Sequence, residues 1–360
     1  MSTNIFDYLE WRGDILFSQV PPGSVDALIF STLAYVDYDG IVPEDVYHFK
    51  PLREVVRKLY ELPDLDKKCR VDKDKELLLA AAESERFGRV GMCYYKNVFI
   101  PEEETQFAAV TFLLEDGTAF LTFRGTDYSI VGWKEDFNMT FQESIPAQRL
   151  AQEYLQYFAS TTVANFRVGG HSKGGNLAVY AAAKNPKAVQ FKIMDIYNHD
   201  GPGFSEKMMN DQGYLNIVPK IRTYVPQSSV FGMLLEHKEP YTIVKSKKIG
   251  IMQHDPYNWT VKGKDFILVE ELAADSRFLD RTMEAWLADM TKEERNEFVD
   301  AVFEMMMEEE NSTIKDILKP SRIKNYIKTL KVDEDKRKII SSEMHKLIDA
   351  AKKARVKMKE

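Results

Sequence analysis

A short strand, a glycine-flanked turn and a helix follow one another near the middle of the chain, and this unit constrains the fold most. Residues 166–168 form a short β-type run, and residues 176–184 are rich in Leu, Ala, Val and Tyr and stop before Pro186. Between these two segments lies Gly170-His171-Ser172-Lys173-Gly174. A strand that passes directly into a helix through so tight a turn is typical of α/β proteins.

Strand and helix patterns alternate through residues 94–261. The β-rich runs 107–114 and 118–123 are joined through Asp116-Gly117, which favours a hairpin because both residues tolerate positive φ. Further along the chain we predict a helix at residues 147–160 and strands at residues 189–197, 220–225 and 241–245. Strands separated by helices predict a mostly parallel sheet covered by helices, and the hairpin adds an antiparallel edge, so the sheet is mixed.

Three zones are expected along the chain. Residues 1–90 are predicted to be an N-terminal helical segment packed on the core, with Ser24 as a helix N-cap and a buried stripe at residues 77–82. Residues 91–272 are predicted to form the α/β core. Residues 273–360 are predicted to be a helical extension, in which Met305-Met306-Met307 is interpreted as core filler.

Composition limits the class of protein. At 360 residues and 44% hydrophobic, the chain can bury one large α/β core with helical additions. No segment reaches the roughly 18 to 20 continuous apolar residues of a membrane span, and the N-terminus has no secretory pattern, so we expect a cytoplasmic protein. Cys69 and Cys93 lack metal-ligand spacing, which argues against a zinc site or a disulfide framework.

Charge is distributed unevenly. The net charge is −7, but residues 319–360 carry +8, so the rest of the chain carries −15 and is unsuited to nucleic acid. The last predicted helix has an apolar stripe opposite a basic face. We expect this helix to pack on the body of the protein, with a dimer seam or peripheral contact with a membrane surface as alternatives, and the oligomeric state stays open.

The turn around Ser172 has the composition of a nucleophile elbow. Glycines two residues before and two residues after the serine leave room for a strained backbone that exposes the hydroxyl, and the N–H of Lys173 would face a developing oxyanion. A phosphate loop is rejected, because there Lys is followed by Ser or Thr, whereas here Ser172 precedes Lys173. A tight turn with an inert serine is the structural alternative.

A second motif lies at the end of the predicted hairpin. Phe123-Arg124-Gly125-Thr126-Asp127 is followed by Trp133 and Asp136. Together with Gly-His-Ser-Lys-Gly downstream, this motif resembles the class 3, or fungal-type, lipases over about residues 107–254. The whole chain resembles a bacterial branch of lipase-like proteins of unassigned function, with similar segments at residues 7–13 and 199–204.

The resemblance implies an α/β-hydrolase-like fold, Ser172 as the nucleophile, and Thr126 with Lys173 at the oxyanion hole. In these lipases the acid of the triad would fall near residues 225–229, where this chain has no carboxylate. We therefore assign the acid to Asp200, which follows the predicted strand 189–197 at the sheet edge where α/β proteins bind ligands. Alternatively, Asp200 only caps the Gly-Pro-Gly turn, and Asp195, Asp255 or a Ser-His dyad takes its place.

The base is assigned to His254, because it follows the strand-like residues 249–252 late in the α/β zone and fits the chain order Ser, Asp, His. His237 and His199 are the alternatives. His171 is expected to pack beneath the nucleophile, and His48 and His345 lie in the terminal zones.

These residues together predict a carboxylic-ester hydrolase that acts on small-molecule or lipid-like acyl esters. Residues 127–144 and 228–237 are candidates for apolar walls or a lid. No metal and no organic cofactor is implied. Peptidase, thioesterase and acyltransferase reactions use the same apparatus, and a non-catalytic binding or regulatory module on a hydrolase scaffold is the alternative from another class.

Overall fold

The structure is a computed structural model, and it describes residues 3–127, 130–139, 142–248, 250–274, 276, 278, 281–282, 285–286, 289–291, 293–295, 297–299 and 334–357. An eight-stranded sheet runs through its centre in the order β1-β2-β3-β4-β5-β6-β7-β8. Its strands are β1 (Lys50–Pro51), β2 (Gly91–Ile100), β3 (Thr105–Leu113), β4 (Ala119–Phe123), β5 (Phe166–His171), β6 (Ile193–His199), β7 (Ile221–Pro226) and β8 (Tyr241–Val244).

The sheet is mixed and mostly parallel, as predicted. Strands β1 to β4 pair antiparallel, and β4 to β8 pair parallel. Gly117 has φ +80°, and the backbone N–H of Thr118 donates to Asp116, so the predicted hairpin turn is confirmed. A second, two-stranded sheet consists of β9 (Val261–Lys262) and β10 (Asp265–Phe266).

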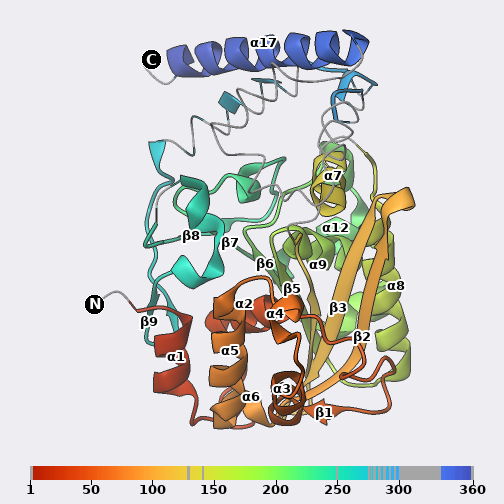
Figure 1. The fold of residues 1–360 in the computed structure, drawn as a ribbon, viewed down its shortest axis with the longest axis vertical. Helices are drawn as coiled ribbons and strands as arrows, with labels where there is room; N and C mark the ends of the chain where they lie inside the picture. Colours follow the sequence, from red (N-terminus) through yellow and green to blue (C-terminus); the bar gives the residue numbers. More distant parts are fainter. Residues whose placement is uncertain are drawn as a thin grey trace.

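One hydrophobic core joins the N-terminal helices to one face of the sheet (Figure 1). Phe30 contacts Phe87, Phe112 and Phe120 with ring centroids 4.7 to 5.1 Å apart, so helix and sheet side chains interlock. The predicted stripe, Leu77, Leu78, Ala81 and Ala82, is buried. The helices are α1 (Ile5–Arg12), α2 (Ser24–Leu33), α3 (Leu52–Tyr60), α4 (Leu65–Lys68), α5 (Asp72–Glu83) and α6 (Glu85–Gly88).

A second core lies on the opposite face, under α8 (Pro146–Thr161), α9 (Lys173–Lys184) and α12 (Gln212–Ile217). Three shorter helices, α7 (Ile130–Asn138), α10 (Lys187–Lys192) and α11 (Glu206–Met209), lie between strands along the chain. Single 3₁₀ turns occur at Pro101–Glu103, Val218–Lys220, Phe231–Met233, Gly250–His254 and Pro256–Asn258. A parallel sheet covered on both faces is the α/β architecture that the alternating pattern predicts.

Three local predictions are wrong. The first half of the strand predicted at residues 189–197 is helix α10, because Pro186 starts a new helix and the side chain of Gln190 bonds the carbonyls of Ala182 and Ala183. The strand-like residues 249–252 fall largely in the 3₁₀ turn Gly250–His254. Ser24 is the first helical residue, since Gly23 is the N-cap and its N–H donates to Asp26.

The C-terminal region contains α17 (Glu334–Lys357), at one end of the molecule (Figure 1). Trp286 Nε1 donates to the carbonyl of Glu343 over 3.1 Å, Lys346 lies 3.0 Å from Glu294, and Ala350 and Ala354 are buried, so α17 packs against Trp286 and Glu294. The predicted Met305-Met306-Met307 cluster lies outside the described residues. Among the helices of the described part of the chain, none combines the length and the apolar character of a membrane-spanning segment.

Candidate active site

Ser172 occupies a strained turn between β5 and α9. Its φ of 58° and ψ of −134° lie outside the regions that residues with a side chain prefer, and its own side chain makes no helix-capping hydrogen bond. A Cβ atom on Gly170 would lie 2.2 Å from the backbone of Gly174, and one on Gly174 would lie 2.1 Å from the carbonyl oxygen of Phe123. Both glycines are therefore required by close backbone contact, which is the geometry of a nucleophile elbow.

The sheet register brings Ser172 and Asp200 to the same edge. Strands β5 and β6 pair in parallel with His171 opposite His199, so the next residue of each strand is Ser172 and Asp200. The N–H of Ser172 donates to the carbonyl of His199 over 2.9 Å. Because this is the carboxyl edge of the parallel strands, both side chains lie where α/β sheets place their reactive groups.

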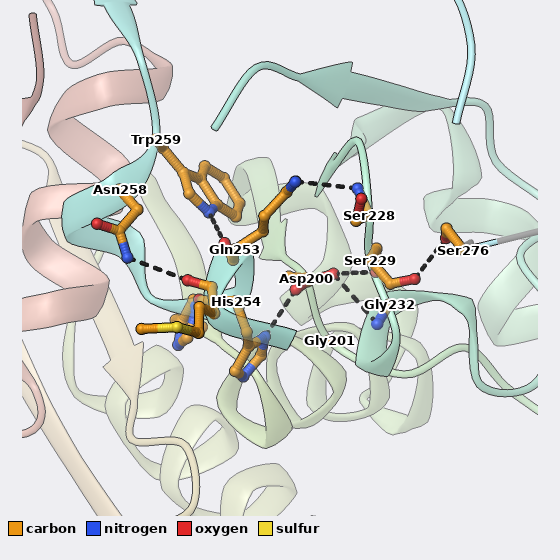
Figure 2. Close-up of polar contacts among 12 residues, drawn as sticks. Asp200, Gly201, Ser228, Ser229, Gly232, Gln253, His254, Asn258, Trp259 and Ser276 are labelled. Carbon is orange, nitrogen blue, oxygen red and sulfur yellow. Dashed lines mark hydrogen bonds and ion pairs between the residues drawn. The ribbon is translucent and has the colours of Figure 1, made fainter. Parts of the chain in front are cut away.

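Asp200 contacts His254 directly. The Nδ1 atom of His254 lies 2.6 Å from Oδ2 of Asp200, and Asp200 is fully buried. The other carboxylate oxygen accepts the hydroxyl of Ser229 and, over 3.1 Å, the N–H of Gly232. Figure 2 shows these three donors around Asp200. Asp200 therefore contacts a histidine and two loop donors as well as standing in the Gly-Pro-Gly turn.

The contact with Asp200 fixes the tautomer of His254. A carboxylate only accepts hydrogen bonds, so Nδ1 carries a proton, and in a neutral imidazole this leaves the lone pair on Nε2. The imidazole packs between His171 and Phe231, with ring centroids 4.5 and 4.4 Å from its own. The His254 side chain is 20% exposed, so its ring can receive a proton from a group at the protein surface.

His171 lies beneath this arrangement, as expected. Its Nε2 donates to the carbonyl of His254 over 2.7 Å, and the hydroxyl of Tyr35 donates to its Nδ1 over 2.9 Å. Burial holds the pKa of His171 well below its usual range, so the ring is neutral and its two nitrogens have fixed roles. A side chain of the N-terminal helical segment thus supports the loop that carries His254.

The alternative histidines have other partners. His237 Nδ1 lies 3.1 Å from Glu239, and its Nε2 donates to the carbonyl of Gly232. His199 is buried at the end of β6 between the rings of Tyr197 and Tyr224, and burial lowers its pKa to about 3. His48 contacts Asp45 at the surface, and His345 lies in α17. Of the six, His254 is the one that the described contacts join to Asp200.

Two further carboxylates had been alternatives to Asp200, and both have separate contacts. Asp195 lies 3.4 Å from Arg222 and 3.8 Å from Arg167. Asp255 caps a 3₁₀ turn by accepting the N–H of Tyr257 over 3.1 Å.

The second motif places Thr126 in the loop after β4, the strand adjacent to β5. Its hydroxyl donates to Oδ2 of Asp136 over 2.5 Å. Burial raises the pKa of Asp136 to about 7, and the charge of Lys173 partly opposes this rise. The side chain of Trp133 lies outside the described residues.

Lys173 begins helix α9, so its backbone N–H belongs to the first turn and lacks an intrahelical acceptor. This leaves the N–H available at the edge where Ser172 lies, and the helix dipole adds positive potential there. The side chain of Lys173 points away into the interior, where Nζ lies 2.6 Å from Oε2 of Glu135. Both charged groups are fully buried, and no pattern in the sequence indicates this pair.

Residues 225–229, which have no carboxylate, contribute a hydroxyl to the site. Ser229 bonds Asp200, and the neighbouring Ser228 N–H donates to the side chain of Gln253 over 2.9 Å (Figure 2). Trp259 Nε1 donates to the carbonyl of Gln253, which fixes the residue before His254. Ser229, Gly232 and Gln253 were missed by the sequence reasoning, since polar residues in loops give no pattern from which a partner could be inferred.

A pocket of about 310 Å³ lies beside the first turns of α9. Its lining includes Asn176 and Tyr180 from α9, Met139 and Gln142 from the segment 127–144, and Leu235 from the segment 228–237. Both predicted wall segments therefore reach one pocket. Among the described residues, there is no group of three or more His, Cys, Asp or Glu side chains that could hold a metal ion.

Comparisons with known proteins give a family. Residues 81–304, more than half of the chain, match the model of the Mbeg1-like family, so this chain belongs to the Mbeg1-like family. No protein in a curated set matches it. A solved structure described as a Rhizomucor miehei lipase propeptide complex aligns with 77% of this chain and 88% of its own, at 14% identity and a TM-score of 0.35, which is too low to carry an argument.

Proposed function

We propose that this protein is a serine hydrolase with an α/β-hydrolase-like fold, similar to class 3 lipases, that cleaves carboxylic esters. The observation that carries the proposal is a strained Ser172 turn at the same sheet edge as Asp200, whose carboxylate contacts His254. A serine held in a backbone region that favours glycine costs on the order of 1 to 3 kcal/mol, and such strain is concentrated at functional sites.

In the proposed reaction, Ser172 attacks the acyl carbonyl while His254 Nε2 takes its proton. Asp200 stabilises the imidazolium that forms, through the contact at Nδ1. The backbone N–H groups of Thr126 and Lys173 hold the negative oxygen of the tetrahedral intermediate. His254 then returns the proton to the leaving alcohol, and water hydrolyses the acyl-enzyme by the same steps.

We place part of the ester in the pocket beside α9, which is lined by a residue four positions after Ser172 but not by Ser172, Asp200 or His254 themselves. Met139, Phe204, Met208 and Leu235 supply apolar surface, and Asn176 lies one helical turn after Ser172. The side chain of Asn176 accepts a hydrogen bond from Gln148 and donates one to the carbonyl of Gly203, so both ends of its amide have hydrogen-bond partners. The lining also includes several polar and charged side chains, so a bound ester would meet both apolar and polar groups there.

The test is a series of p-nitrophenyl esters with increasing acyl length, assayed against wild type and Ser172→Ala. We expect turnover with a burst of p-nitrophenol from the first acylation in wild type, and loss of both in the variant. A folded wild-type protein that hydrolyses none of the esters contradicts the proposal and favours the non-catalytic module.

A further inference from the structure

The buried ion pair between Lys173 and Glu135 takes no part in the proton transfers proposed above, although Lys173 directly follows Ser172 in the chain. Both side chains are fully buried, with Nζ 2.6 Å from Oε2. Removing two charges from water is unfavourable, and replacing a buried pair by apolar residues often leaves a protein as stable or more stable. Stability alone is therefore a weak reason for the pair.

The pair joins four elements around the start of α9. Glu135, on α7, accepts the N–H of Ala147 at the start of α8 over 3.0 Å and the N–H of Gln106 on β3 over 3.2 Å. Lys173 also donates to the carbonyl of Gln106 over 2.9 Å. The first residue of α9 is thereby fixed relative to β3, α7 and α8.

The residue next to Glu135 holds the other loop of the site. Asp136 accepts the hydroxyl of Thr126, so two consecutive residues of α7 contact Lys173 and Thr126. These are the two residues whose N–H groups are proposed to hold the oxyanion. Helix α7 thus contacts both residues whose N–H groups are the proposed donors, Thr126 after β4 and Lys173 after β5.

We propose that Lys173 and Glu135 are positioning residues, whose side-chain ion pair sets the backbone N–H of Lys173 relative to that of Thr126. This inference rests on the proposed function. A donor that stabilises the tetrahedral intermediate acts mainly in the transition state, so misplacing it lowers kcat more than it raises KM.

The experiment uses the full chain with the neutral double substitution Lys173→Met and Glu135→Gln. Either single change leaves a buried charge without its partner, whereas the double variant removes both charges. The amide oxygen can still accept one of the two N–H groups that Glu135 accepts, that of Ala147 or that of Gln106. The backbone N–H of residue 173 remains present. We expect kcat on a short-chain p-nitrophenyl ester to fall by roughly ten- to a hundredfold, with KM within about threefold of wild type.

A second readout is inhibition by a trifluoromethyl ketone, which forms a tetrahedral adduct with an active serine. Its inhibition constant should rise by about the same factor as kcat falls, because the adduct carries the oxyanion that the two N–H groups hold. A merely structural role would leave this affinity unchanged in a folded variant.

The matched control is Lys184→Met, which removes another lysine of α9 that has a carboxylate partner, Asp211, at the exposed end of the helix. It should keep wild-type kcat. A double variant that melts like wild type and keeps wild-type kcat overturns the inference while leaving the ester hydrolase intact. If the double variant fails to fold, Glu135→Gln alone is measured below its melting temperature by the same criterion. Wild type without ester turnover overturns the proposed function and this inference with it.

Discussion

Replacing Asp200 by Asn separates a catalytic carboxylate from a turn cap. The side chain keeps its size, and an amide oxygen at the Oδ1 position can still accept the donors from Ser229 and Gly232. The amide nitrogen then faces His254 Nδ1 at the 2.6 Å contact. Because that nitrogen donates, Nδ1 must accept, the proton moves to Nε2, and the ring can no longer take a proton from Ser172.

This wrong tautomer predicts a fall in kcat of roughly a hundredfold to ten-thousandfold, equivalent to about 2.7 to 5.4 kcal/mol of lost transition-state stabilisation. The assay is kcat on a soluble p-nitrophenyl ester, together with the melting temperature. Asp195→Asn is the matched control, since Asp195 lies on the same strand, β6, and contacts Arg222 and Arg167 instead of a histidine.

The turn-cap interpretation predicts a different result, because Asn caps turns about as well as Asp. Wild-type turnover in Asp200→Asn would refute the reasoning. Collapse in Asp255→Asn instead would move the acid to that residue, and three unaffected variants would indicate a Ser-His dyad.

Two further predictions concern buried charges. The raised pKa of Asp136, about 7, means that the native state binds more protons than the unfolded state between about pH 4 and 7, so this group lowers stability as pH rises through that window. Asp136→Asn should therefore be more stable than wild type at pH 8, by at most about 4 kcal/mol, but not at pH 4. Urea unfolding at the two pH values measures this difference, and an equal effect at both would contradict the prediction. Arg86 and Asp26 form a buried ion pair at 2.7 Å, so Arg86→Met should lower the free energy of unfolding by about 3 to 5 kcal/mol. A melting temperature equal to that of wild type would count against this prediction.

Much of the architecture was predictable because it depends on local pattern. The strand, turn and helix around Ser172 follow from two glycines that a close backbone contact requires, and the Asp116-Gly117 hairpin follows from positive φ. The strand predicted at residues 189–197 failed in its first half because Pro186 and the bonds made by Gln190 override the β-branched composition. Such side-chain to backbone bonds leave no periodic trace in a sequence.

The site was predictable to the extent that chain order and sheet edges limit it. Asp200 and His254 were inferred from their positions after strand-like segments, and the structure brings them into contact. The partners of Asp200 and the Lys173–Glu135 pair join residues far apart in the chain through single contacts, so no spacing rule indicates them.

The most direct test of the central claim is labelling of the wild-type protein by a fluorophosphonate probe, followed by mass spectrometry of the modified peptide. The account predicts one phosphonylated residue, Ser172, with labelling lost in Ser172→Ala and strongly slowed in His254→Ala, because the probe needs an activated serine beside a base. A folded wild-type protein that stays unlabelled, or that is labelled at a residue other than Ser172, would contradict it.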